Sequence, residues 1–172
     1  MGKECSSTEQ VPMSEIKIKI ENLYKIFGPR AKEYTDKVKS GIDKDELLAK
    51  YNHVLGLDNI NLDIKEQSIQ VVMGLSGSGK STLIRHINRL IEPTEGTVLV
   101  DGEDITKLNK ADLLEFRRNK TGMVFQRFAL FPHHNILDNV QFGLSIKNLD
   151  KSESQDKAMY WIEKVGLTGF EN

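Results

Sequence analysis

Alternating apolar and polar residues predict two strands in the N-terminal part of the chain. The apolar positions are Ile16, Ile18 and Ile20 in the first strand and Ile60, Leu62 and Ile64 in the second. This period of two is typical of a strand with one buried face. The residues between the strands, 28–52, are highly charged and include a short helical pattern from Asp43 to Tyr51. We therefore expect an insertion between two strands of one sheet.

A short apolar run and a helical pattern follow directly on one another near the middle of the chain. The run from Val71 to Met73 predicts a short buried strand, and residues 82–91 have the period of a helix with one apolar face. The residues of that face are Leu83, Ile84, Ile87, Leu90 and Ile91. Residues 74–81 thus join a predicted strand to a predicted helix.

Turns, strands and helices alternate in the rest of the chain. Residues 92–96 and 101–102 predict turns, 98–100 and 123–125 predict strands, and 110–119 predict a helix. A last helix is predicted from four apolar residues that share one face, with Ser152 as N-cap and Gly166 as C-cap. These four residues are Ala158, Trp161, Ile162 and Val165.

Composition indicates a globular domain without a charge-driven partner. The 172 residues are 38% hydrophobic and 28% charged, with a net charge of -1, which gives no reason to expect nucleic acid as a partner. The single cysteine, Cys5, excludes an intrachain disulfide. Residues 1–13 are polar and predict a flexible tail, so we place the folded part at 14–172.

The linking segment carries a complete G-x-x-x-x-G-K-[ST] phosphate-binding motif. Its residues, with the threonine that follows, are Gly74, Leu75, Ser76, Gly77, Ser78, Gly79, Lys80, Ser81 and Thr82. Glycines let the backbone curl so that N–H groups point at phosphate oxygens, and the helix after them adds its positive end. Lys80 is the candidate for the β- and γ-phosphates of ATP, and Ser81 for Mg²⁺. The alternative is a chance Gly/Ser-rich turn, which the flanking strand and helix disfavour.

A second motif narrows the class of nucleotide-binding protein. Gln126 follows the predicted strand 123–125 and precedes Phe128-Ala129-Leu130-Phe131-Pro132-His133, and this segment resembles the Q-loop of ABC-type ATPases. In that family the glutamine completes the Mg²⁺ shell and lies near the attacking water, so the resemblance makes Gln126 a candidate metal ligand and, with Lys80, a candidate catalytic residue. The alternative is a surface glutamine after an unrelated strand.

The resemblance extends from about residue 14 to the end. Leu23-Tyr24-Lys25-Ile26-Phe27-Gly28 resembles the family segment whose aromatic residue stacks on adenine, which makes Phe27 a candidate for that role; simple core packing is the alternative. The segments 18–28, 43–48 and 72–77 are similar to the ATP-binding subunits of glycine betaine/proline importers, the ProV-like branch.

This resemblance implies an α/β P-loop NTPase fold, the N-terminal part of an ABC nucleotide-binding domain with a mixed sheet and an incomplete RecA-like core. It also implies that ATP binding and hydrolysis drive transport of an osmolyte through a membrane permease, which the residues after Gln126 contact. Further implied partners are a second ATP-binding subunit in a head-to-tail dimer and, indirectly, a solute-binding protein. The implied location is the cytoplasmic face of the cell membrane, reached through the permease.

Two family motifs are missing from the printed sequence. No apolar run ending in Asp-Glu, the Walker B pattern, follows Gln126, and no Leu-Ser-Gly-Gly signature occurs. The chain resembles a truncated domain that is expected to bind ATP without hydrolysing it. Two alternatives stay open: a non-catalytic fragment that binds nucleotide or the membrane subunit, and another P-loop enzyme such as a small-molecule kinase.

Overall fold

The computed structural model describes residues 15–125, 130–146 and 149–172. The chain divides into two compact units, Met1–Leu113 and Leu114–Asn172, which are described separately. The expected tail at 1–13 and the candidate Gln126 lie outside the described residues.

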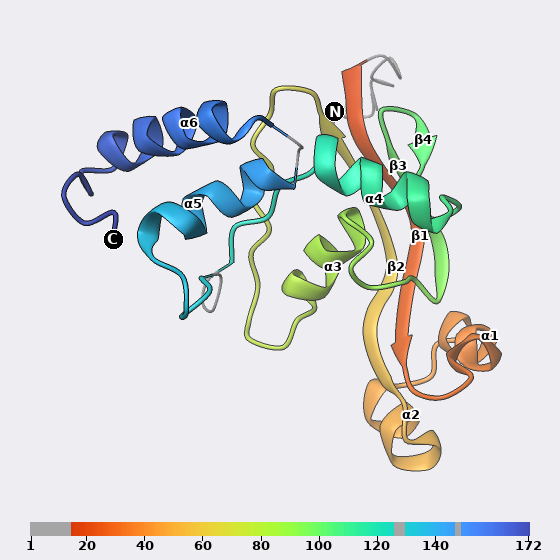
Figure 1. Cartoon of the computed structure of the whole chain (residues 1–172). Coiled ribbons are helices and arrows are strands. Elements are labelled where there is room, and N and C mark those ends of the chain that lie inside the picture. Colours follow the sequence, from red (N-terminus) through yellow and green to blue (C-terminus); the bar gives the residue numbers. More distant parts are fainter. Residues whose placement is uncertain (1–14, 126–129, 147–148) are drawn as a thin grey trace, which may run out of the picture. The chain divides into compact units, whose positions relative to one another are not determined.

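The first unit is built on an antiparallel sheet of four strands. These are β1 (Ile16–Phe27), β2 (Val54–Lys65), β3 (Glu95–Val100) and β4 (Glu103–Asp104). Their order is β2-β1-β3-β4, and the two long strands lie side by side along their length (Figure 1). The alternating pattern thus predicted both long strands, and the predicted strand 98–100 is the end of β3.

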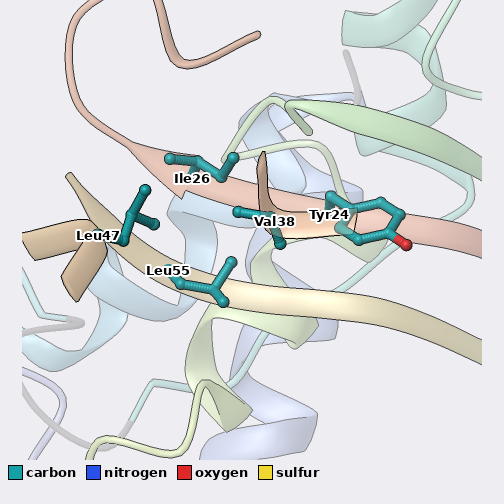
Figure 2. Close-up of a cluster of buried hydrophobic side chains, with 5 residues drawn as sticks. All are labelled: Tyr24, Ile26, Val38, Leu47 and Leu55. Carbon is teal, nitrogen blue, oxygen red and sulfur yellow. The ribbon is translucent and has the colours of Figure 1, made fainter. Parts of the chain in front are cut away.

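The charged insertion between β1 and β2 folds onto the end of these strands. It contains η2 (Ala31–Tyr34), α1 (Thr35–Lys39) and α2 (Lys44–Tyr51), which confirms the predicted helix. Asp43 caps α2, because its Oδ1 accepts a hydrogen bond of 2.8 Å from the backbone N–H of Asp45. Apolar side chains from both strands and both α-helices form a shared buried cluster (Figure 2), whose members are Tyr24, Ile26, Val38, Leu47 and Leu55.

Two predicted strands are absent from the described structure, and these predictions were wrong. Residues 71–73 and 123–125 have no strand pairing, and Val71 and Val124 are 63% and 98% exposed. A short, continuously apolar strand is stable when neighbouring strands and helices cover it. The described sheet pairs only antiparallel strands and offers these two segments no partner.

The helix after the phosphate-binding motif is shorter than predicted. It is α3 (Lys80–Ile87), and of the five expected apolar residues Leu83 is buried while Ile84 and Leu90 are exposed. The helix ends where Arg89 takes a left-handed conformation with φ 51°. The apolar pattern 82–91 therefore spans a helix and the turn that follows it.

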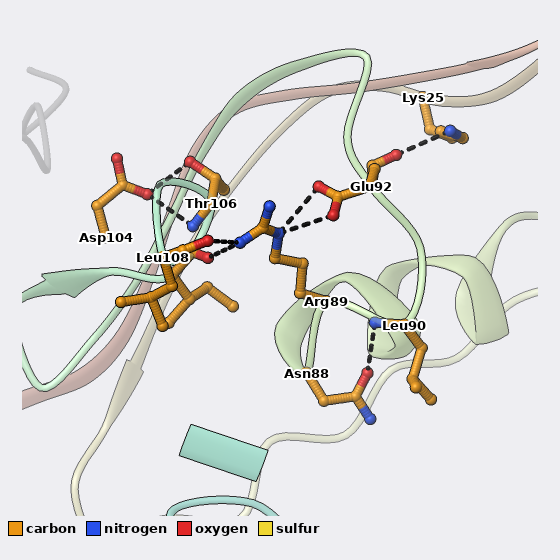
Figure 3. Close-up of polar contacts among 9 residues, drawn as sticks. Lys25, Asn88, Arg89, Leu90, Glu92, Asp104, Thr106 and Leu108 are labelled. Atoms are coloured by element: carbon orange, nitrogen blue, oxygen red, sulfur yellow. Dashed lines mark hydrogen bonds and ion pairs between the residues drawn. The ribbon is translucent and has the colours of Figure 1, made fainter. Parts of the chain in front are cut away.

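Arg89 fixes the chain after α3 to the segment after β4 (Figure 3). Its Nη1 donates to the carbonyl oxygens of Ile105 and Leu108 at 3.0 and 2.6 Å, and its Nε lies 2.9 Å from both carboxylate oxygens of Glu92. The Glu92 carbonyl in turn accepts a hydrogen bond of 2.8 Å from Lys25 Nζ on β1. Arg89 thus joins the chain after α3 to the segment after β4, and Lys25 joins the same chain segment to β1.

The second unit packs two helices together, α5 (Ile136–Ser145) and α6 (Lys151–Lys164). The predicted helix 110–119 is α4 (Lys110–Asn119), which spans the boundary between the units. Ala158 and Ile162 are fully buried as predicted, but Trp161 and Val165 are exposed, so half of the predicted apolar face was wrong.

The ends of α6 agree with the prediction at one end only. Asp150 is the N-cap of α6 in place of Ser152, because its carboxylate accepts a hydrogen bond from the Ser152 N–H at 3.1 Å. Gly166, with φ 73°, follows the end of α6 as expected of a helix-terminating glycine.

Candidate functional site

The phosphate-binding motif forms a curled loop between the end of β2 and α3. Ser76 and Gly77 form a turn, and the Ser78 N–H donates to the Leu75 carbonyl at 3.2 Å. Gly77 and Gly79 have φ values of 80° and 89°, a left-handed conformation that only glycine adopts without strain. Gly79 is also the N-cap of α3, so the free N–H groups of the first helical turn face the loop.

Lys80 holds its ammonium group inside this curl. Nζ donates to the carbonyl oxygens of Gly74 and Leu75 at 2.8 and 2.6 Å and approaches Ser78 Oγ at 3.3 Å. These contacts draw residues 74–80 into a ring around one positive charge. That charge and the start of α3 together make the loop attractive to an anion.

The loop borders a hollow of about 260 Å³ that has a polar and an apolar side. Residues 77–82, including Ser81 and Thr82, form the polar side, and the apolar side consists of Phe27, Val54, Leu55 and Gly56. Lys80 is the one ionisable side chain among the described residues that line it. A nucleoside triphosphate has the matching division, with a polyanionic end and a flat aromatic end.

This arrangement fits a nucleotide and offers a metal ion one ligand. Mg²⁺, when bound with a nucleotide, neutralises phosphate charge, and the Ser81 hydroxyl at the mouth of the loop is the described residue that could hold it. Among the described residues, no group of three or more His, Cys, Asp or Glu side chains forms a metal site. Gln126, the second expected ligand, lies outside the described residues.

The sequence predicted one side of the hollow and missed most of the other. The predicted residues Phe27 and 77–82 line it, while Gly74 and Leu75 contribute the carbonyl oxygens that hold Lys80. Val54, Leu55 and Gly56 were not predicted to take part. Gly56 did carry a signal, because a glycine within a strand indicates a close approach of another chain segment.

A buried histidine lies on α3 behind the loop. His86 is 1% exposed, and its Nδ1 is 2.7 Å from the Thr82 carbonyl oxygen. Burial lowers the pKa of His86 below its ordinary value, and the nearby Lys25 ammonium lowers it further. His86 is therefore neutral near pH 7, so it adds no buried positive charge behind the loop.

The described part of the segment after Gln126 is held against α5 by two side chains, Asn139 and Phe142. Asn139 on α5 accepts a hydrogen bond of 2.7 Å from the Phe131 N–H and donates to the carbonyls of Phe131 and His134 at 3.2 and 3.1 Å. The Phe131 ring packs on Phe142 with centroids 4.5 Å apart. This segment therefore has a defined shape in the second unit.

Comparisons with known proteins agree on one family. The model of the family described as "ABC transporter" matches residues 57–172. The glycine betaine transport ATP-binding protein OpuAA of Bacillus subtilis is 47% identical over 157 residues, 91% of this chain and 38% of that protein. The glycine betaine/proline betaine transport system ATP-binding protein ProV of Escherichia coli is 47% identical over 155 residues, 90% of this chain and 39% of that protein.

Solved structures give the same result for the fold. The dimeric ATP-binding cassette MJ0796, in a post-hydrolysis state bound to ADP and Pi, is 31% identical with a TM-score of 0.70, covering 90% of this chain and 60% of that one. The match supports the predicted fold class, an α/β P-loop NTPase domain. The chain spans about two fifths of the length of the curated relatives named above, which it covers to 38% and 39%. No helix among the described residues is long and apolar enough to cross a membrane.

Proposed function

The chain belongs to the ABC transporter family, and from this premise we propose that it binds MgATP through residues 74–82, with the base against Phe27. The hollow carries this proposal, because it combines the loop, Lys80 and an aromatic ring in one site. Lys80 serves as the cation for the β- and γ-phosphates, Ser81 as a Mg²⁺ ligand and Thr82 as part of the helix start that faces the phosphates.

We further propose that the whole protein energises an importer of glycine betaine or a similar small quaternary amine. The identities of 47% to OpuAA and ProV support this substrate class. The proposed partners are a membrane permease, contacted through the segment after Gln126, and a second ATP-binding subunit arranged head to tail. A solute-binding protein acts indirectly, and the permease holds the protein at the cytoplasmic face of the membrane. Gln126 is proposed to act on Mg²⁺ and the attacking water.

Isothermal titration with MgATP tests the binding site. Lys80→Ala should weaken binding by about 1.5–3 kcal/mol, or roughly ten- to a hundredfold, because a charge-assisted contact with phosphate is lost. Lys65→Ala, which removes an exposed lysine of β2 outside the hollow, is the matched control and should leave affinity unchanged. Equal affinities of the wild type and Lys80→Ala would contradict the proposal.

Phosphate release in the same samples tests whether the chain hydrolyses the ATP that it binds. The printed sequence holds no Walker B pattern, so we expect this chain to bind ATP without turning it over. Steady phosphate release that depends on Lys80 would show that the chain contains a general base, and it would favour an autonomous NTPase.

A further inference from the structure

Gly56 lies on the apolar side of the hollow, against the ring of Phe27. A Cβ atom built on Gly56 would lie 2.6 Å from Cε2 and 3.2 Å from Cδ2 of Phe27, closer than side-chain carbons pack. Gly56 is not among the glycines with positive φ, so its backbone conformation suits any residue. A larger side chain at this position would therefore have to displace the Phe27 ring, whereas the backbone would need no change.

The phosphate loop approaches the same residue. A Cβ atom built on Gly79 would lie 2.5 Å from the Gly56 carbonyl oxygen, so the loop backbone rests directly against β2 at this point. The Phe27 ring occupies the space that a side chain at position 56 would fill. Gly79 instead approaches the backbone carbonyl of Gly56. The aromatic ring and the loop are thus both positioned against one residue.

We propose that Gly56 is a positioning residue of the nucleotide site, whose missing side chain lets the Phe27 ring lie over β2 where the base of a nucleoside triphosphate stacks. This inference rests on the proposed function. It gives Gly56 a role because Gly56 contacts the Phe27 ring, although it contacts no phosphate. Val54, the register partner of Phe27, continues the apolar wall beside it. The role predicts that Gly56 affects recognition of the base and not of the triphosphate.

The test compares MgATP with inorganic tripolyphosphate plus Mg²⁺ as ligands of the full chain. Gly56→Ala pushes the ring aside, so MgATP should bind at least about fivefold more weakly, because base stacking on an aromatic ring is lost. Tripolyphosphate has no base, and its affinity should change less than about twofold, which also reports a folded loop. Gly122→Ala is the matched control: Gly122 also lacks a positive φ, but a Cβ there would meet nothing within 4 Å.

Removing the Phe27 ring tests whether Gly56 affects MgATP affinity through that ring. In a Phe27→Ala background, Gly56→Ala should have no further effect on MgATP affinity, because the clash is gone. An unchanged ATP-to-tripolyphosphate ratio in Gly56→Ala, or an equal loss of MgATP affinity in both backgrounds, would overturn the inference. If Gly56→Ala loses both ligands, recovery of tripolyphosphate binding on adding Phe27→Ala supports it, and no recovery overturns it. A wild-type chain that binds tripolyphosphate but not ATP overturns it as well, whereas one that binds neither refutes the proposed function itself.

Discussion

The ammonium group of Lys80 is hydrogen-bonded to the loop that it is proposed to serve. Its contacts with the carbonyls of Gly74 and Leu75 hold the cation in the centre of the curl. Phosphate oxygens would replace these neutral acceptors with charged ones, which form stronger hydrogen bonds. Lys80 thus contributes both a proposed ligand contact and hydrogen bonds that shape the loop.

His86 makes the stability of the first unit depend on pH. Because burial lowers its pKa, the folded chain stays unprotonated at this site while the unfolded chain binds a proton below the usual pKa of about 6.5. The free energy of unfolding should therefore fall as pH decreases from 7.5 to 5.5, by at most about 1.4 kcal/mol per pH unit for one proton. Urea unfolding at several pH values measures this dependence.

The matched variant for this dependence is His86→Gln, which keeps a hydrogen-bond donor near the Thr82 carbonyl and does not titrate. It should flatten the pH dependence of the unfolding free energy between pH 7.5 and 5.5. The same slope in wild type and variant would mean that other groups cause it.

At the scale of elements, a comparison of two glycines of the loop distinguishes the cost of backbone strain from the cost of a steric clash. Gly77 and Gly79 have similar left-handed conformations, but a Cβ at Gly77 would meet nothing within 4 Å, whereas one at Gly79 would collide with β2. Gly77→Ala should destabilise the fold by about 1–2 kcal/mol, the cost of a left-handed alanine. Gly79→Ala should cost clearly more, because the loop must also move away from Gly56.

Urea unfolding monitored by circular dichroism compares the two glycine variants. Equal losses of unfolding free energy would show that the loop does not rest against β2, which would remove the basis for a single site formed by both elements.

Arg89 and Arg30 form a second matched pair, because both have φ close to 50°. Arg89 donates to two carbonyls and pairs with Glu92, whereas Arg30 has an exposed ion pair of 3.5 Å with Glu33. We expect Arg89→Gln to lower the unfolding free energy by about 1.5–3 kcal/mol and Arg30→Gln by less than about 0.5 kcal/mol. Chemical denaturation of both variants measures the difference, and similar small losses would mean that Arg89 does not join α3 to the segment after β4.

The alternating pattern predicted both long strands, whereas fully apolar runs gave mixed results: 98–100 forms the end of β3, but 71–73 and 123–125 form no strand. Ile16 to Ile20 alternate with charged residues, so one local pattern identifies the buried face of β1. Val71 to Met73 carry no such contrast, and whether they pair depends on neighbours that local sequence does not reveal. The phosphate loop was predictable because its motif fixes backbone and chemistry together, while Gly56 belongs to the site through a contact between distant residues.

At the scale of the whole molecule, the apolar side chains before the loop are largely exposed. Ile69 and Met73 are 94% and 86% exposed. Val71→Ser and Met73→Ser should therefore change the free energy of unfolding by less than about 0.5 kcal/mol, the usual effect at an exposed site. They should also reduce the fluorescence of a bound hydrophobic dye such as ANS, because less apolar surface remains.

Val98→Ser provides the buried reference for this comparison, since Val98 is fully buried in β3. It should destabilise the fold by several times as much as the two exposed substitutions. A large loss of stability in Val71→Ser would instead support the buried strand that the sequence predicted.

Hydrogen–deuterium exchange with and without MgATP tests the central claim, that the phosphate loop and the apolar wall of β2 form one nucleotide site. We expect slower exchange in peptides covering residues 74–82 and 54–57 of the wild type, and no such change in Lys80→Ala at the same ATP concentration. Protection of 74–82 alone would contradict a shared site. Protection confined to segments outside the hollow would place ATP elsewhere on the chain.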